Sequence, residues 1–129
     1  MKEPKWLSLL EVQFIHEKSI QQAGGSHGIR DGGLLESALA RPQNLYAYGE
    51  TDIFQLASSY AKSISRNHPF VDGNKRTAFM SADVFLFYNG HDLQASEGEN
   101  HADMMENLAQ GKMTKEDAGR YLKKHSRPR

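Results

Sequence analysis

The sequence predicts an all-α domain of five to six helices packed around a central apolar helix. Three observations lead to this prediction. Apolar residues recur at helical spacing in several segments, and helix-capping residues stand before several of them. No stretch in which apolar and polar residues alternate is long enough to require a sheet. The length of 129 residues fits one domain with one core, over residues 1–129.

A capping box formed by Ser8 and Glu11 predicts a first helix over residues 8–22. Glycines end this helix and open the loop GGSHGIRDGG, residues 24–33, which is the most flexible stretch of the chain by composition. A small hairpin near residues 26–50 is the alternative to a purely helical arrangement in this part of the chain.

The next helix is predicted to be short, over residues 33–40, because the residue before Pro42 is pushed out of the helical region. Residues 43–50 are expected to be irregular, with Tyr46 and Tyr48 as packing anchors. This part of the chain is therefore predicted to be a short helix followed by a connecting segment.

Two strongly patterned helices follow. Asp52 can cap the first, over residues 52–66, where apolar residues fall on one broad face. The second, over residues 74–89, is apolar nearly all round, and such a helix is normally central in a globular bundle. His68 stands directly before Pro69 and is therefore not expected in the middle of a helix.

Two further helices, over residues 97–110 and 114–125, complete the predicted fold. The segment 91–110 carries five acids and no lysine or arginine, whereas the basic tail, residues 120–129, carries five bases and no acid. A solvated acidic face and a frayed basic tail are the simplest interpretation of this charge pattern. A docking tail for a partner is the alternative.

Composition excludes several classes of protein. Lysine and arginine number 16 and aspartate and glutamate number 16, so no overall field favours nucleic acid or an anionic membrane. The absence of cysteine excludes disulfides, zinc–thiolate sites and thiol nucleophiles. No apolar run is long enough for a membrane span, and the segment MKEPKWLSLLE lacks the apolar region of a secretory signal. We therefore expect a cytoplasmic protein that binds neither nucleic acid nor membrane directly.

The segment HPFVDGNKR, residues 68–76, is unusual because it is polar and yet leads into the most apolar predicted helix. It combines an imidazole, a carboxylate, an amide and two adjacent cations: His68, Asp72, Asn74, Lys75 and Arg76. Each has a simpler structural explanation when taken alone. A histidine before proline is more often a capping or packing residue, Asp-Gly is more often a turn, and Lys-Arg at a helix start is usually solvated.

Taken together, these residues have the chemistry of a phosphoryl- or nucleotidyl-transfer site. A helix N-terminus binds anions, and here Gly73 permits close approach while Lys75 and Arg76 add positive charge. Two cations are unfavourable beside the positive end of the helix dipole unless an anion binds there. Asp72 is the type of oxygen ligand that binds Mg²⁺ together with substrate phosphates, and an imidazole such as that of His68 can act as a base.

The motif HPFVDGNKR resembles the Fic-domain signature H-P-F-x-[DE]-G-N-G-R, and more closely its death-on-curing (Doc) branch, in which the second glycine is lysine. The upstream stretch GGSHGIRDGGLLESALARPQNLYAYGE and the downstream helix TAFMSADVFLFYNG are also similar to Doc-type toxins, as is the chain length. The resemblance covers nearly the whole chain. It implies a single Fic/Doc domain with a compact, Fic-like helical bundle.

The resemblance also implies a role for each motif residue. His68 would be the general base that deprotonates a target hydroxyl, and Asp72 would hold Mg²⁺ against the phosphates of ATP. Phe70 would anchor the loop in the core and have no chemical role. The phosphates would be bound by an anion hole of Gly73 and Asn74 and by the side chains of Lys75 and Arg76.

The Doc branch implies a toxin of a toxin–antitoxin pair. Such a toxin is a Mg²⁺-dependent, kinase-like phosphotransferase that moves the γ-phosphoryl group of ATP to a threonine of elongation factor Tu and halts translation. An antitoxin encoded alongside neutralises it. Lys75 and Phe79 stand where adenylylating Fic members have a glycine and, in many cases, a second arginine, which favours phosphoryl transfer. Transfer of AMP and a non-catalytic nucleotide-binding module are the alternatives.

Some Fic proteins carry an internal inhibitory helix with the pattern [ST]-x-x-x-E-[GN]. Glu97-Gly98 and Glu106-Asn107 come nearest, but Leu93 and Ala102 stand four positions before these glutamates, so neither fits. Inhibition is therefore expected from another chain. We expect a disordered antitoxin tail to fold in a groove beside the motif, walled by the glycine-rich loop and residues near Tyr46 and Tyr48, within residues 24–50. The alternative is that this loop is only a mobile connector.

Overall fold

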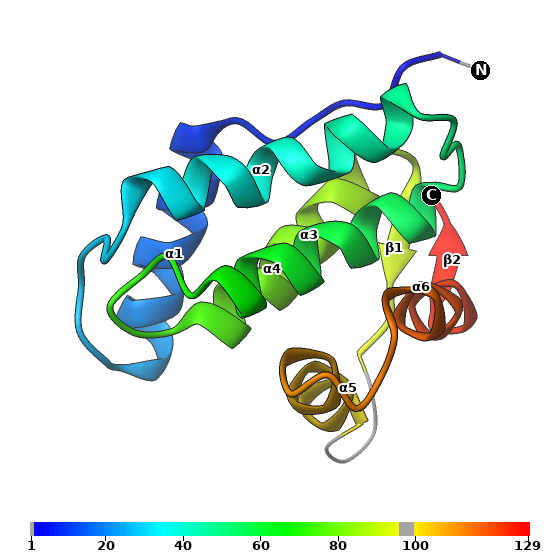
Figure 1. Ribbon diagram of the computed structural model, residues 1–129. Helices are drawn as coiled ribbons and strands as arrows, with labels where there is room; N and C mark the ends of the chain where they lie inside the picture. Colours follow the sequence, from blue (N-terminus) through cyan, green and yellow to red (C-terminus); the bar gives the residue numbers. More distant parts are fainter. Residues whose placement is uncertain (1, 96–99) are drawn as a thin grey trace.

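The computed structural model describes residues 2–95 and 100–129 and confirms the all-α prediction (Figure 1). Within these residues there are six helices and one small antiparallel sheet of two strands. The elements are α1 (Leu9–Ala23), α2 (Gly32–Ala47), α3 (Ile53–Asn67), α4 (Asn74–Tyr88), β1 (His91–Leu93), α5 (Asn100–Ala109), α6 (Lys115–Lys124) and β2 (Ser126–Pro128). No helix in the described part of the chain is long and apolar enough to cross a membrane.

Helices α3 and α4 pack against each other at the centre of the fold (Figure 1). Helix α3 also packs against α2, α5 and α6, and α4 packs against α1, α5 and β1. One cluster of buried apolar side chains draws on all six helices, and the rings of Tyr60 on α3 and Phe85 on α4 meet within it at 5.0 Å. The helix that was predicted to be central, α4, therefore shares the centre with α3.

The capping residues that were predicted at the starts of α1 and α3 are confirmed. Ser8 and Glu11 form both bonds of the capping box: the Glu11 N–H donates to Ser8 Oγ at 3.1 Å, and the Ser8 N–H donates to Glu11 Oε1 at 2.9 Å. Asp52 caps α3 by accepting the Phe54 N–H at 2.9 Å. These bonds satisfy N–H groups that would otherwise lack partners in the first turn.

The predicted end of the second helix before Pro42 is wrong, because α2 continues through this residue to Ala47. A proline inside a helix leaves the carbonyl four residues earlier without its usual donor. That carbonyl belongs to Ala38, and the Ser63 hydroxyl of α3 donates to it at 2.8 Å. Pro42 is itself buried. A neighbouring helix therefore supplies the hydrogen bond that the proline cannot make.

The alternative of a hairpin near residues 26–50 is also wrong. Strands β1 and β2 come from much later in the chain, and α2 occupies most of the proposed hairpin. Of the two expected packing anchors, Tyr46 packs against Trp6 with ring centroids 5.6 Å apart, but Tyr48 is 92% exposed. Both tyrosines lie at the C-terminal end of α2, whereas the glycine-rich loop leads into its N-terminal end.

The basic segment 120–129 is not the frayed tail that its composition indicated. Its first part is helical within α6, and its last part forms β2, which pairs with β1. The Arg129 N–H donates to Gly90 O at 2.9 Å, and the Arg129 guanidinium lies 3.6 Å from the ring centroid of Phe87. At the other end of the chain, the Lys5 N–H donates to Asn89 Oδ1 at 2.8 Å. Both ends of the chain therefore meet the C-terminal end of α4.

Candidate active site

The motif HPFVDGNKR forms the turn between α3 and α4 and the start of α4, at one end of this central helix pair. His68 ends α3 in a left-handed conformation, with φ 53° and ψ 52°, which agrees with the prediction that it does not lie within a helix. Gly73 precedes α4 with φ 75°, a value that glycine adopts at little cost. Between them, Phe70 is fully buried, so the ring anchors the turn in the core as expected. Two left-handed residues thus reverse the chain within a few positions.

Asn74 holds the two ends of this turn together from a largely buried position. Its Oδ1 accepts the Phe70 N–H at 2.9 Å, and its Nδ2 donates to Phe70 O at 3.0 Å, so these two bonds fix the orientation of the amide. The same Nδ2 lies 2.6 Å from Nδ1 of His68. Because an amide nitrogen only donates, Nδ1 accepts, and a neutral His68 ring carries its proton on Nε2. The Asn74 side chain, expected in an anion hole, is therefore engaged by the turn itself.

Asp72 lies exposed at the mouth of the turn. Its Oδ1 accepts the Gly73 N–H at 2.9 Å and its Oδ2 accepts the Ser26 N–H at 3.2 Å. The bond from Ser26, followed by that from Gly73 and by the charge of Arg76, holds the pKa of this carboxyl below its usual value of 3.8. The group is therefore ionised at neutral pH, as a metal ligand must be.

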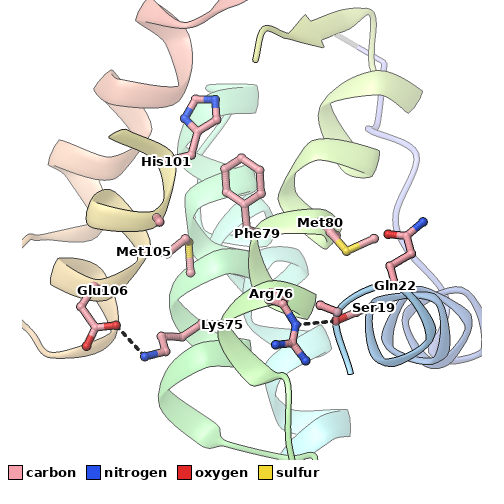
Figure 2. Close-up of a pocket in the computed structure, with 11 residues that line it drawn as sticks. Ser19, Gln22, Lys75, Arg76, Phe79, Met80, His101, Met105 and Glu106 are labelled. Carbon is pink, nitrogen blue, oxygen red and sulfur yellow. Dashed lines mark hydrogen bonds and ion pairs between the residues drawn. The ribbon is translucent and has the colours of Figure 1, made fainter. Parts of the chain in front are cut away.

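The two motif cations point away from each other and are both engaged (Figure 2). Lys75 Nζ lies 2.5 Å from Glu106 Oε2 on α5, and this ammonium lowers the pKa of Glu106. Arg76 Nε donates to Ser19 Oγ at 3.1 Å, and its Nη2 donates to Gly24 O at 2.8 Å. The two cations thereby link the start of α4 to α5 on one side and to α1 on the other.

All six predicted site residues line one cleft of about 290 Å³. They are His68, Asp72, Gly73, Asn74, Lys75 and Arg76. Helix α3 supplies Ser65 to the other walls, and α5 supplies Glu106 and Ala109, followed directly by Gln110. The start of α4 has no side-chain cap, so its first backbone N–H groups have no side chain to accept from them.

Three residues that the motif did not indicate hold the turn from outside. His16 is buried, stacks on Phe70 with ring centroids 3.9 Å apart, and donates from Nε2 to Asp72 O at 2.9 Å. Arg30 donates from Nε to His68 O at 2.7 Å and from Nη2 to Asn67 O at 3.0 Å. Glu106 is the partner of the motif lysine. These residues lie far from the motif in the sequence and reach it only in the folded chain, so no local sequence pattern predicts their contacts with it.

The glycine-rich loop is held closely against the motif. Ile29 and Phe70 form an antiparallel bridge, and the Val71 N–H donates to Gly28 O at 3.0 Å. The Arg30 N–H donates to Pro69 O at 2.7 Å. Backbone hydrogen bonds and the Arg30 side chain thus fix a stretch that its composition predicted to be the most flexible part of the chain.

A second cavity, of about 410 Å³, lies between α1, α4 and α5 and adjoins the motif cleft (Figure 2). Lys75, Arg76 and Glu106 line both spaces. Most of the remaining lining is apolar and comes from Ala23, Phe79, Met80, Ala102 and Met105. Of the candidate inhibitory glutamates, Glu106 lies at this junction, and Glu97 lies outside the described residues. The cleft and the cavity thus share the motif cations as a common wall.

The residues present fit a magnesium ion bound together with phosphates rather than a site made by the protein alone. No group of three or more histidine, aspartate or glutamate side chains in the described residues could hold a metal. Asp72 contributes one exposed, ionised carboxylate, and Glu106, the other carboxylate of the cleft, is paired with Lys75. Mg²⁺ commonly binds through one or two carboxylates and completes its octahedron with substrate phosphates and waters.

Comparison with known proteins identifies relatives of this chain. The sequence model of the Fic/DOC family matches residues 6–86. A protein of Escherichia phage P1 named "Protein kinase doc" is 36% identical over 105 residues, which are 81% of this chain and 82% of that protein. A protein of Mycolicibacterium smegmatis named "Toxin Doc" is 42% identical over 91 residues, which are 67% of this chain and 68% of that protein. With the motif in place at the start of α4, these matches show that the chain belongs to the Fic/DOC family.

Proposed function

We propose that this chain is a Doc-type toxin that transfers the γ-phosphoryl group of ATP to a threonine hydroxyl of a translation factor, such as elongation factor Tu. The observation that carries the proposal is the convergence of the six predicted site residues of the motif on one cleft at the uncapped start of α4. The names of the two relatives, a protein kinase and a toxin, support the same class of activity.

The phosphates of ATP would bind at the N-terminus of α4. This end has no side-chain cap, and the carboxylate nearest to it, Asp72, accepts the Gly73 N–H instead of an N–H of the helix. Backbone N–H groups and the helix dipole together favour an anion there. Because the Asn74 side chain is engaged by Phe70 and His68, the anion hole consists of backbone N–H groups and not of the Asn74 amide.

Lys75 and Arg76 would neutralise the phosphates after giving up part of their present contacts. Lys75 would exchange Glu106 for a phosphate oxygen, and Arg76 would exchange Ser19 or Gly24. The ion pair between Lys75 and Glu106 is about half exposed to solvent, and exposed ion pairs contribute little to stability, so its exchange costs little. Arg76 has two hydrogen bonds and can keep one of them while it gives up the other. The present contacts of Lys75 and Arg76 thus hold both cations near the cleft and still leave them available to a phosphate ligand.

Asp72 would bind Mg²⁺, which supplies positive charge to the phosphates when it is present. The carboxylate is exposed and ionised, and one backbone N–H from Ser26 and one from Gly73 orient it. The Ser26 bond comes from the glycine-rich loop, and His16 holds the backbone of Asp72 from the other side. The loop and α1 therefore position the metal ligand although they carry no part of the motif.

His68 would accept the proton of the target hydroxyl as its oxygen attacks the γ-phosphorus. The new oxygen–phosphorus bond forms, the bond between the γ-phosphorus and the bridging oxygen breaks, and ADP leaves with that bonding pair. Because Asn74 donates to Nδ1, the ring accepts a proton there only when the hydroxyl displaces the Asn74 amide. The proton then resides on an imidazolium that carries hydrogen on both nitrogens.

Phosphoryl transfer is favoured over adenylyl transfer by the residues beside the cleft. Phe79 lies one turn after Lys75 and Arg76 on α4 and packs against His101 with ring centroids 5.0 Å apart. An aromatic ring thus occupies the position where many adenylylating family members have a second arginine. Without that arginine, the γ-phosphate lacks the partner that would hold it away from the attacking hydroxyl.

Control by an antitoxin segment would use the cavity between α1, α4 and α5. Its apolar lining suits an amphipathic helix that folds on binding, and its shared wall of Lys75 and Arg76 brings such a helix against the phosphate-binding cations. The groove expected beside Tyr46 and Tyr48 is less suitable, since these residues lie at the far end of α2 from the motif.

A label-transfer experiment tests the proposal. The purified chain is incubated with bacterial lysate and with ATP labelled at either the γ- or the α-phosphate, and His68→Ala serves as the matched control. We expect the γ-label to reach a protein of the size of elongation factor Tu, and His68→Ala to reduce transfer by about 10²–10⁴-fold. Mass spectrometry of the target should find one phosphoryl group on a threonine. Transfer of the α-label, or an AMP adduct, would instead establish adenylyl transfer and refute the proposal.

A further inference from the structure

A separate polar cavity lies between α2, α3 and α6, and none of its lining residues lines the motif cleft. Its volume of about 440 Å³ is in the range of pockets that bind small molecules. Helix α2 contributes one cation to its lining, α3 two and α6 one: Arg41, Lys62, Arg66 and Lys115. Glu116 is the carboxylate among the lining residues. The cavity therefore has a local excess of three positive charges in a chain whose net charge is zero.

Three of these cations make no hydrogen bond or ion pair in the described part of the chain, although the charge of Lys62 acts at longer range on Glu116 and helps to lower the pKa of that carboxyl. The side chains of Arg41, Lys62 and Arg66 make no hydrogen bond or ion pair with residues 2–95 or 100–129. Like charges that face one cavity repel each other, so this arrangement is unfavourable until an anion or solvent ions neutralise it. Arg41 comes from α2, whereas Lys62 and Arg66 come from α3, so helix packing and not a local run of basic residues brings them together.

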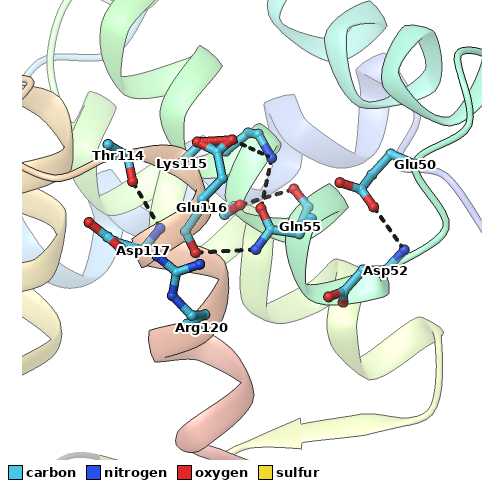
Figure 3. A network of polar contacts seen from close by, with 9 residues as sticks. Glu50, Asp52, Gln55, Thr114, Lys115, Glu116, Asp117 and Arg120 are labelled. Atoms are coloured by element: carbon cyan, nitrogen blue, oxygen red, sulfur yellow. Dashed lines mark hydrogen bonds and ion pairs between the residues drawn. The ribbon is translucent and has the colours of Figure 1, made fainter.

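The fourth cation, Lys115, also lines the cavity and is held in a network of polar contacts (Figure 3). Lys115 Nζ donates to Gln55 Oε1 at 2.8 Å and lies 3.4 Å from Glu116 Oε2. Gln55 Nε2 in turn donates to Glu116 O at 3.2 Å. These contacts tie the start of α6 to α3 and keep the ammonium largely buried beside the cavity, with 15% of the side chain exposed.

A serine hydroxyl gives an independent indication of a ligand. Ser59 lies on α3 among the lining residues and is 1% exposed, yet its Oγ has no hydrogen-bond partner in the described residues. Buried hydroxyl groups are nearly always hydrogen-bonded, so an unpaired one requires an explanation. Because this oxygen is buried, the Ser59 side chain would have to rotate toward the cavity for an oxygen of a bound anion to accept from it while the surrounding cations neutralise the charge.

We propose that this cavity binds a small molecule that carries one or more phosphate groups. A phosphate or diphosphate carries the two to three negative charges that the cavity lacks, whereas a single carboxylate would leave most of the excess unbalanced. The guanidinium groups of Arg41 and Arg66 match phosphate oxygens with paired hydrogen bonds. The site is distinct from the motif cleft, and its occupancy does not depend on the transferase activity proposed above.

Nuclear magnetic resonance can test this site and the motif cleft separately in the same sample. The ¹⁵N-labelled chain is titrated with pyrophosphate and with inorganic phosphate at constant ionic strength, and sodium chloride serves as the non-specific control. We expect saturable shifts of the backbone amides of Ser37, Ser59 and Ser63, which line the cavity on two helices. Shifts at Gly73 and Asn74 report the motif cleft and do not count for the proposal.

Two variants and a matched control sharpen the test. Arg41→Gln should weaken pyrophosphate binding by about tenfold, the loss typical of one charge-assisted hydrogen bond. Lys123→Gln removes the same charge from an exposed residue of α6 outside the cavity and should change the affinity little. Ser59→Ala should also weaken binding while leaving the melting temperature of the free chain unchanged or higher, because it removes a hydroxyl that has no partner there.

Three results would overturn the proposal. Shifts that do not saturate, or that sodium chloride reproduces, would mean that the cations form only a solvated face. Equal effects of Lys123→Gln and Arg41→Gln would mean that general charge and not the cavity attracts the probe. Tighter binding of a short single-stranded RNA, with shifts that extend beyond the cavity, would indicate a macromolecular partner instead of a small ligand.

Discussion

The amide Nδ2 of Asn74 lies 2.6 Å from Nδ1 of His68, and two bonds to the backbone of Phe70 fix which way that amide faces. The residue that shapes the turn therefore also determines which nitrogen of the candidate base carries the proton. This relationship depends on the order of residues within the motif, because Asn74 follows Phe70 by one helical turn and can reach both its N–H and its C=O.

The first prediction concerns this tautomer. In the free chain, ¹⁵N spectra should show that the neutral form of the His68 ring carries its proton on Nε2, because Asn74 donates to Nδ1. Asn74→Asp should invert this preference, since a carboxylate accepts from Nδ1–H and cannot donate. A wild-type ring protonated on Nδ1 would contradict the geometry and the displacement step that follows from it.

The second prediction concerns Asp72. Asp72→Asn should raise the Mg²⁺ concentration that half-maximal activity requires, because an amide is a weaker ligand than a carboxylate. In the wild-type chain, the lowered pKa of Asp72 also sets how its contribution to stability depends on pH. The stabilisation from its hydrogen bonds is fully present above the ordinary pKa of 3.8, and it is lost as the pH falls through the lower pKa of the folded chain. Carbon-13 titration of this carboxyl should therefore give a value below 3.8. Unchanged Mg²⁺ dependence in Asp72→Asn would remove this residue from the metal site.

The third prediction separates positioning from stability at His16. This ring stacks on Phe70 and donates to the Asp72 carbonyl. His16→Phe keeps the stacked ring but loses the N–H donor. It should therefore raise the Mg²⁺ concentration that half-maximal activity requires and change the melting temperature little. His16→Gln keeps an N–H donor and should recover part of the Mg²⁺ response. Equal Mg²⁺ dependence in all three forms would assign His16 a structural role alone.

The fourth prediction concerns the proline within α2. Ser63→Ala should cost about 1–3 kcal/mol of unfolding free energy, because the buried Ala38 carbonyl then loses its donor. Ser58→Ala is the matched control: this buried hydroxyl also donates to a carbonyl, that of Gln55, which lies within a helix without a following proline. Urea denaturation measures both.

A double-mutant cycle checks the explanation for Ser63. In a Pro42→Ala background the backbone N–H of residue 42 can donate to Ala38 O, so the cost of Ser63→Ala should fall. Equal costs in the two backgrounds would show that Ser63 stabilises the chain in some way other than by replacing the donor that proline lacks.

The fifth prediction concerns toxicity and its control. Expression of the chain alone should slow bacterial growth, and expression together with the protein encoded beside it should restore growth. His68→Ala is the control and should not slow growth. Mixing the two purified proteins should give a negative heat-capacity change, because folding of a disordered segment on the apolar cavity buries apolar surface. Normal growth with soluble, folded, unaccompanied wild-type chain would contradict the toxin assignment.

The sequence predicted the fold best where the determinants were local. The capping box of Ser8 and Glu11 and the cap at Asp52 depend on residues within one helical turn, and both were correct. Pro42 misled the prediction because its missing hydrogen bond is replaced by Ser63, 21 positions later in the chain. The order of the basic segment 120–129 depends on pairing with β1, which no local pattern indicates.

The candidate site likewise contains residues that the sequence could predict from local patterns and residues that it could not. The six motif residues that line the cleft could be found from the sequence because they are nearly contiguous and lie on one turn. His16, Arg30 and Glu106 could not be found, since each reaches the motif from another element. The role of the Asn74 side chain was also missed, because an amide at the start of a helix can donate to a ligand or bind its own turn, and only the geometry distinguishes the two.

The meeting of both chain ends at one end of α4 has a practical consequence. Lys5 bonds to Asn89 and Arg129 bonds to Gly90, whereas the motif lies at the opposite end of the same helix. A helix of 15 residues is about 22 Å long. A fluorophore, affinity tag or sensor surface attached at either terminus would therefore leave the cleft open, so the chain can be immobilised for capture of its target without engineering an internal attachment point.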